Sequence, residues 1–220
     1  MKFNEITKIL DEEIKPPKTN GIIVLDIDDT LITADPKVIK IYKSFKGGPE
    51  TALNTAEFAK DPDKEKPGYK YDYRDFKNPE KVYESIVHGT PMLRNLKMMD
   101  AHIRAGYEVA FLTARGLQKV VASALSDFLL YKNKEGKLVK LPKNVFRTDL
   151  SAAVNDDDIN YPGSTDAEKK ANVLRKLCKK YGQVVFVDDD PRNIATTRKL
   201  AKTLPNLKVV QASKEPWNGR

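Results

Sequence analysis

The segment 21–31, GIIVLDIDDTL, constrains the fold of this chain more than any other stretch. It opens with four apolar residues, Ile22 to Leu25, a run that is typical of a strand buried on both faces of a parallel sheet. Such a strand cannot bury unpaired carboxylates, so we expect it to end at Asp26. Because side chains alternate along an extended chain, Asp26 and Asp28 should lie on one side and Ile27 on the other. The sequence therefore predicts two adjacent acids at the carboxyl end of a buried strand.

The composition describes a single folded domain over residues 1–220. Apolar residues make up 40% of the chain and charged residues 32%, which is typical of a fold with one core and room for a small insertion. The only cysteine, Cys178, excludes an intrachain disulfide and is consistent with a reducing compartment. Residues 1–18 lack the apolar segment of a signal peptide, and no apolar run is long enough to span a bilayer. We therefore expect a cytoplasmic protein without a membrane partner.

The formal net charge of +8 favours anionic binding partners. Nucleic acid is one such partner, but the excess consists of lysine, whereas arginine is the residue that makes bidentate contacts to phosphates and bases. We expect Lys37, Lys40 and Lys43 to lie on solvated helix faces. The charge therefore indicates anionic substrates in general and leaves nucleic acid as a less favoured alternative.

Helical and strand patterns alternate after residue 89. The expected helices cover 90–105, 117–130, 166–181 and 191–202, and the expected strands 107–112, 145–147, 183–187 and 207–210, with a hairpin at 133–139 and an N-terminal helix at 4–13. With the first strand, this predicts an α/β fold: a Rossmann-like parallel five-stranded sheet, order 3-2-1-4-5, with helices on both faces. Residues 33–88 are rich in Gly, Pro and Tyr and predict a small cap-type insertion of short helices and loops after strand 1.

Reactive residue types follow three of the expected strands. The first strand ends in DIDDT at 26–30, the second in TAR at 113–115 and the fourth in DDD at 188–190, while TDAEKK at 165–170 opens the helix before that fourth strand. This ordered set resembles the four motifs of the haloacid dehalogenase-like (HAD) phosphohydrolases over residues 21–210. Within that superfamily the chain is most similar to the class B acid phosphatases, in the Asp-Asp-Thr ending of the first motif, in residues 99–106 and in residues 211–213. It differs from them at Ala114, where those enzymes have Gly.

The resemblance implies catalytic roles for four residues. Asp26 would attack phosphorus and form an aspartyl-phosphate, and a carboxylate that is ionised at neutral pH needs no deprotonation for this step. Asp28 would protonate the leaving alcohol and later deprotonate water. Thr113 would donate a hydrogen bond to a phosphoryl oxygen, and Lys170 would neutralise charge in the transition state, with the adjacent Lys169 as the alternative. Substrate contacts are expected from Thr30 and Arg115.

A divalent cation is also expected. The candidate ligands are all oxygens and the sequence contains no cluster of His and Cys, so Mg²⁺ is the predicted ion. Its ligands would be the carboxylates of Asp26 and Asp188 and the backbone carbonyl of Asp28, with Asp189 as the second choice. Asp190 is expected to cap the helix that begins at Pro191 instead.

The sequence therefore predicts a Mg²⁺-dependent phosphomonoesterase acting on a nucleotide or another small organic phosphate. Two alternatives remain: a polynucleotide end-processing (3′-) phosphatase, and a non-catalytic protein that binds nucleic acid or protein through a HAD fold. Transfer of the phosphoryl group to an alcohol instead of water would use the same intermediate. The aromatic residues at 69–76 would either form a lid that stacks on a base or anchor the insertion to the core. The oligomeric state does not follow from the sequence.

Overall fold

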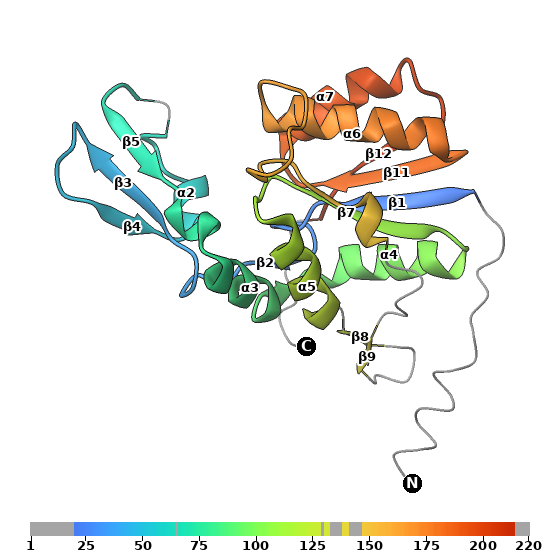
Figure 1. Ribbon diagram of the computed structural model, residues 1–220, viewed down its shortest axis with the longest axis horizontal. Helices are drawn as coiled ribbons and strands as arrows, with labels where there is room; N and C mark the ends of the chain where they lie inside the picture. Colours follow the sequence, from blue (N-terminus) through green and yellow to red (C-terminus); the bar gives the residue numbers. More distant parts are fainter. Residues whose placement is uncertain (1–19, 65, 129, 133–137, 141–146, 214–220) are drawn as a thin grey trace, which may run out of the picture.

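The computed structural model describes residues 20–64, 66–128, 130–132, 138–140 and 147–213 (Figure 1). The helix expected at 4–13 lies outside the described residues, as do positions 145 and 146 of the expected third strand. A central sheet between two layers of helices forms the larger part of the protein, and a small antiparallel sheet extends from one side of it (Figure 1).

The central sheet has five parallel strands and confirms the predicted α/β class. Its order is β10-β7-β1-β11-β12, which in order of appearance along the chain is third, second, first, fourth and fifth. The strands are β1 (Gly21–Leu25), β7 (Glu108–Thr113), β10 (Ala152–Ala153), β11 (Gln183–Asp188) and β12 (Leu207–Gln211). Leu25 pairs with Phe111 on one side and Val187 on the other, so β1 occupies the centre of the sheet. This position explains why every residue of β1 is apolar or Gly and buried.

Helices cover both faces of the sheet. Alternate residues of the strands point to opposite faces and belong to two separate hydrophobic clusters. Ile23 and Leu25 pack with the helices α4 (Leu93–Arg104) and α5 (Gln118–Phe128). Ile22 and Val24 pack with α6 (Asp166–Lys180), and Leu200 of α7 (Pro191–Ala201) belongs to the same cluster. Figure 1 shows α6 and α7 on one side of the sheet and α4 and α5 on the other. The boundaries of α5, α6 and α7 agree with the sequence prediction to within two residues.

Two predicted elements differ from the structure. Of the third strand expected at 145–147, only Arg147 is described: it lies outside any strand, forms ion pairs with Glu108 and Asp149, and is followed by the short helix η2 (Thr148–Leu150). The edge position is taken by β10, whose two alanines pair with Leu112 and Thr113. A two-residue strand has no periodicity, so only the tertiary pairing defines it.

The helix predicted from residue 90 begins three positions later. Thr90–Pro91 forms the strand β6, which pairs antiparallel with β2 (Ile32–Thr33), and α4 then begins at Leu93. The Thr-Pro pair resembles a helix start, but proline is also accepted in an edge strand because its missing N–H is not needed there. The predicted hairpin exists as β8 (Leu130–Lys132) paired with β9 (Leu138–Lys140), with the connecting residues 133–137 outside the described part.

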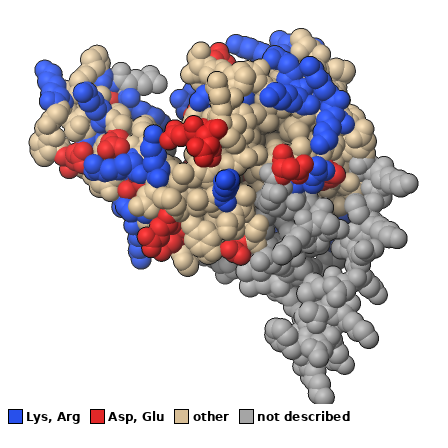
Figure 2. Space-filling model, in the orientation of Figure 1, with Lys and Arg blue, Asp and Glu red and all other residues tan. Residues whose placement is uncertain are grey.

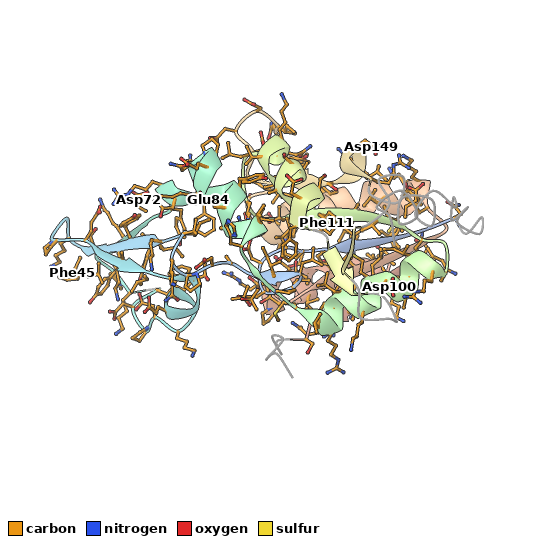
Figure 3. The ribbon with its side chains drawn as sticks, turned by 90° about the horizontal axis from the view of Figure 1, so that it is seen from below. Phe45, Asp72, Glu84, Asp100, Phe111 and Asp149 are labelled. Carbon is orange, nitrogen blue, oxygen red and sulfur yellow. The ribbon has the colours of Figure 1, made fainter. Side chains whose placement is uncertain are left out.

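The insertion contains a sheet that the sequence analysis missed. Its strands are β3 (Ile41–Phe45), β4 (Thr51–Leu53) and β5 (Tyr69–Asp72), in the antiparallel order β4-β3-β5, and its helices are α2 (Thr55–Ala59), η1 (Arg74–Lys77) and α3 (Pro79–Val87). Lys43 therefore lies in a strand, and Lys37 and Lys40 lie in no helix, contrary to the expected helix faces. Figure 3 shows Phe45 at the outer end of this sheet and Phe111 within the core.

Polar contacts replace much of the apolar packing in this sheet. Lys43 Nζ lies 2.7 Å from carboxylate oxygens of both Asp61 and Asp63, and Tyr71 donates a hydrogen bond to Asp61. β4 and β5 have only three and four residues, so any alternation along them is too short to predict a strand. Among the described residues, no helix has the length and apolar character needed to cross a membrane.

Candidate active site

The carboxyl ends of β1, β7 and β11 meet at one edge of the sheet, next to the first turns of α6 and α7. A cavity of about 620 Å³ opens there. It is lined by Asp26, Asp28, Asp29, Ala114, Thr165, Asp166, Ala167, Lys170, Asp189, Asp190, Arg192, Asn193 and Thr196. Ligands of open parallel sheets commonly bind at this edge. The structure therefore brings residues of all four sequence motifs together around one cavity.

Lys170 joins two of these motifs. Its Nζ atom lies 2.8 Å from Asp26 Oδ1 and 2.8 Å from Asp188 Oδ2, and only 1% of the Lys170 side chain is exposed. The helix that carries Lys170 starts at a capping box, in which Thr165 and Glu168 exchange side-chain to backbone hydrogen bonds. The neighbouring Lys169 points elsewhere, with its Nζ 2.8 Å from Asn155 Oδ1. Of the two lysines left open by the sequence, Lys170 is the one at the site.

The burial of this cluster shifts the pKa of its members. Burial raises the pKa of Asp26 well above the usual carboxyl range, the positive charge of Lys170 opposes this shift, and the nearby acids Asp188 and Asp28 add to it. Burial alone would lower the pKa of Lys170, but the two carboxylates that it contacts raise it above the normal lysine value. Lys170 is therefore a fixed positive charge between two acids.

Three carboxylates are arranged so that they could hold a cation. One oxygen each from Asp26, Asp188 and Asp189 lies within 4.8 Å of the others. Asp188 is fully buried and already accepts hydrogen bonds from Asn193 Nδ2 and the backbone N–H of Asp190, while Asp189 lines the cavity. This oxygen-only donor set suits a hard divalent ion. The side chain of Asp28 does not belong to this trio.

The negative charge of the cavity also favours the binding of a cation. Six of its lining residues are aspartates, against the two cations Lys170 and Arg192. A phosphate dianion would be repelled by such a surface unless positive charge were added. The negative charge of Asp190 is partly neutralised, because its side chain forms an ion pair with Arg192. The same side chain caps α7, as predicted.

Asp28 is held by Arg115. The Nε and Nη2 atoms of Arg115 donate to the two oxygens of Asp28 at 2.8 and 2.7 Å, and Nη1 donates to Ser85 Oγ at 2.8 Å and to the carbonyl of Val82 at 3.4 Å. The Arg115 side chain is 1% exposed. This differs from the expectation that Arg115 contacts substrate phosphate, since its hydrogen bonds are directed at protein groups.

Two further predicted residues are buried away from the cavity. The side-chain oxygen of Thr113 accepts the backbone N–H of Arg115 at 3.1 Å, and Thr113 is only 1% exposed. Thr30 is fully buried, and its Oγ1 atom has no hydrogen-bond partner within the described part of the chain. Neither threonine lines the cavity, so the substrate contacts expected from their side chains stay predictions.

Sequence reasoning missed two asparagines that support the site. Asn95 donates to the carbonyl of Thr30 and also pairs with the backbone of Ser213, which ties the first motif to the end of β12. Asn155 donates to the carbonyl of Ala114 at 2.7 Å and to Asp166 at 2.9 Å. A single Asn in a helix or polar loop carries no sequence signal for such a role, because its partners are distant in the chain.

A second cavity of about 630 Å³ lies between the insertion and the core. It shares Asp28, Ala114, Asp166 and Arg192 with the first cavity. Its insertion side includes Phe58, Tyr73 and Phe76, whose rings meet at edge-on angles, with Tyr73 between the other two. Figure 2 shows a recess between the insertion and the α6–α7 layer, and Lys and Arg side chains gathered over that layer. The aromatic residues of 73–76 therefore face a cavity that continues from the acidic one, whereas Tyr69 packs against Phe45.

Comparison with known proteins gives no family. No protein-family model, no curated protein and no solved structure matches this chain.

Proposed function

We propose that this protein is a Mg²⁺-dependent phosphomonoesterase with a Rossmann-like, HAD-type fold, which works through an aspartyl-phosphate on Asp26. The observation that carries the proposal is the contact of Lys170 with both Asp26 and Asp188 at the carboxyl edge of a parallel sheet. Asp189 completes a trio of acids beside the same cavity. A nucleophilic carboxylate, a buried cation and a cation-binding trio in one cavity are the parts that phosphoryl transfer requires.

The residues divide the chemistry between them. Asp26 supplies the oxygen that attacks phosphorus, and the bond from phosphorus to the alcohol oxygen breaks. Lys170, whose Nζ lies 2.8 Å from Asp26 Oδ1, stabilises the negative charge that develops on the transferring group. Asp28, which lines the same cavity, exchanges protons with the alcohol and with water. Mg²⁺, held by Asp26, Asp188 and Asp189, would offset the repulsion between the acids and the phosphate.

The adjoining aromatic cavity favours a small organic phosphate with a planar group, such as a nucleotide. A phosphate near Asp26 would have its alcohol portion directed through the shared residues toward Tyr73 and Phe76. Stacking of a base on an aromatic ring contributes about 1–3 kcal/mol in other proteins. The cavity volume of about 630 Å³ lies within the range that binds ligands of this size.

A phosphate-release screen tests the proposal. Purified protein is incubated with Mg²⁺ and nucleoside monophosphates, sugar phosphates and aryl phosphates, beside the variant Asp26→Asn and the surface control Asp100→Asn. We expect release by the wild type and by Asp100→Asn, and a loss of at least about 10³-fold in Asp26→Asn with an unchanged circular dichroism spectrum. Equal rates in Asp26→Asn and the wild type would remove Asp26 from the mechanism.

A second candidate, the polynucleotide end-processing (3′-) phosphatase, is favoured by one observation. A groove of about 350 Å³ between α6 and α7 is lined by Arg175 and Lys199 and shares Thr196 with the acidic cavity. A nucleic-acid strand along this groove would make turnover of a 3′-phosphorylated oligonucleotide fall steeply with salt, while turnover of a mononucleotide would not. If no monoester released phosphate but nucleic acid still bound, the non-catalytic alternative would replace both.

A further inference from the structure

Arg115 connects Asp28, the candidate acid–base residue, to α3, the last helix of the insertion. Its guanidinium forms a two-point contact with Asp28 and, through Nη1, a hydrogen bond to Ser85 Oγ of α3. Ser85 is itself fully buried and donates to the carbonyl of Val82, which also accepts from Arg115. α3 in turn packs its buried residues Val82 and Ile86 into the core cluster that contains β1. Three segments of the chain therefore meet at one buried side chain.

The geometry limits what Arg115 can do. A planar guanidinium that donates to both oxygens of an ionised carboxylate fixes the plane and the direction of that carboxylate. Asp28 retains a side-chain exposure of 33%, compared with 1% for Arg115, and Asp28 lines both cavities. Arg115 lines the second cavity and not the acidic one, and its Nε and Nη2 atoms are directed at Asp28. Its hydrogen bonds therefore hold the candidate acid–base residue.

We infer that Arg115 is a positioning residue that acts through Asp28, and that Ser85 holds Arg115 so that docking of α3 is required for efficient catalysis. This inference rests on the proposed function. The step concerned is the hydrolysis of the aspartyl-phosphate: a water oxygen bonds to phosphorus, the bond from phosphorus to the Asp26 oxygen breaks, and the water proton moves to Asp28. An ionised carboxylate held in one orientation by Arg115 is the acceptor that this step needs.

The two roles open to Arg115 have opposite kinetic signatures. If Arg115 positions Asp28 for hydrolysis, Arg115→Ala slows only the second step, the hydrolysis of the aspartyl-phosphate. This holds for an aryl phosphate, because its good leaving group needs no proton in the first step. Both kcat and KM then fall by the same factor of about 10 to 100, so that kcat/KM stays constant. The phosphoenzyme accumulates, and its formation is seen as a rapid initial burst of aryl alcohol. If Arg115 binds phosphate, kcat/KM falls and inhibition by inorganic phosphate weakens.

The experiment uses p-nitrophenyl phosphate, Mg²⁺ and the full chain, with Arg115→Ala, Arg115→Lys and Ser85→Ala. We expect the positioning signature in Arg115→Ala and the same signature, smaller, in Arg115→Lys and Ser85→Ala. In the Asp28→Asn background, removal of Arg115 should cost no further steady-state activity, because a residue that acts through another has no effect once that residue is absent. The control Arg147→Ala removes two partly exposed ion pairs, with Glu108 and Asp149, and Arg147 lines neither cavity, so both kinetic constants should stay unchanged.

Three results would overturn the inference. A fall in kcat/KM with weaker phosphate inhibition would make Arg115 a substrate-binding residue. If the losses of activity in Asp28→Asn and Arg115→Ala add up in the double variant, Arg115 does not act through Asp28. A Ser85→Ala variant that lowers the melting temperature without altering kcat would remove the link to α3. If Arg115→Ala does not fold, Arg115→Lys and Ser85→Ala provide the same comparison. Failure of the proposed function is distinct, since the wild type itself would then release no phosphate.

Discussion

The Nζ atom of Lys170 lies 2.8 Å from Oδ1 of Asp26, although 144 positions separate the two residues in the chain. The contact exists because β1 and β11 are neighbours in the sheet, and α6 runs back across that sheet face before β11 begins. Lys170 and Asp26 are both almost fully buried, so their charges interact strongly. This pair is the centre of the candidate site, and it provides the first prediction.

The substitution Lys170→Met should destabilise the protein and abolish activity. It keeps an unbranched apolar side chain but leaves Asp26 and Asp188 adjacent without their shared cation. Breaking a buried ion pair from one side costs about 3–5 kcal/mol. Urea unfolding measures the loss, and added Mg²⁺ should restore part of it because the ion supplies the missing positive charge.

The neighbouring substitution Lys169→Met is the matched control. Lys169 contacts the exposed Asn155 and no carboxylate of the trio, so we expect a change in unfolding free energy of no more than about 0.5 kcal/mol and near-normal turnover. A larger loss of activity in Lys169→Met than in Lys170→Met would reverse the assignment of the two lysines.

Removal of the metal-binding acids should change the response to Mg²⁺. We expect Asp188→Asn and Asp189→Asn each to raise the Mg²⁺ concentration for half-maximal activity by about 10-fold or more, since each removes one charged oxygen of the trio. Asp190→Asn is the control, because asparagine caps a helix as well as aspartate does, and its midpoint should move far less. Unchanged Mg²⁺ titration in Asp188→Asn would leave Asp189 as the main ligand.

The aromatic cavity should determine the preference for nucleotides. Tyr73 is 44% exposed, so Tyr73→Ala should fold normally, yet it removes a ring that lines the cavity. We expect its KM for a nucleoside monophosphate to rise on the order of 10-fold and its KM for a small alkyl phosphate to stay constant. Phe45→Ala, equally exposed at the outer end of the insertion, should change neither value. A uniform rise for all substrates would point to a role other than base recognition.

The insertion sheet should have its own pH signature. Partial burial and the hydrogen bond from Tyr71 to Asp61, 2.9 Å long, raise the pKa of the phenol from 10.0 to about 12. A pKa that is higher in the folded state contributes stability that is complete below pH 10 and is lost as the pH rises through about 12. The difference in tyrosinate absorbance between the wild type and Tyr71→Phe should therefore titrate near pH 12. A midpoint at the ordinary value would contradict the pairing with Asp61.

Local patterns predicted much of the fold. The apolar run before Asp26 marked the central strand, because a strand buried on both faces must be apolar throughout. Asp190 marked the start of α7, because capping depends on hydrogen bonds within one turn of helix. The sheet of the insertion was missed, since two of its strands have only three and four residues and much of its stabilisation comes from contacts between distant residues, such as the ion pair Lys43–Asp61.

The sequence by itself determined which residue types stand at the ends of the strands, because alternation and capping act over a few residues. Only the tertiary structure decided which of them meet. It selected Lys170 over Lys169 and directed the guanidinium of Arg115 to Asp28 and Ser85, so that Arg115 does not line the acidic cavity. It also buried the side chains of Thr30 and Thr113. These contacts depend on the paths of helices that cross the sheet between distant segments, and no local pattern encodes the distance between two such segments.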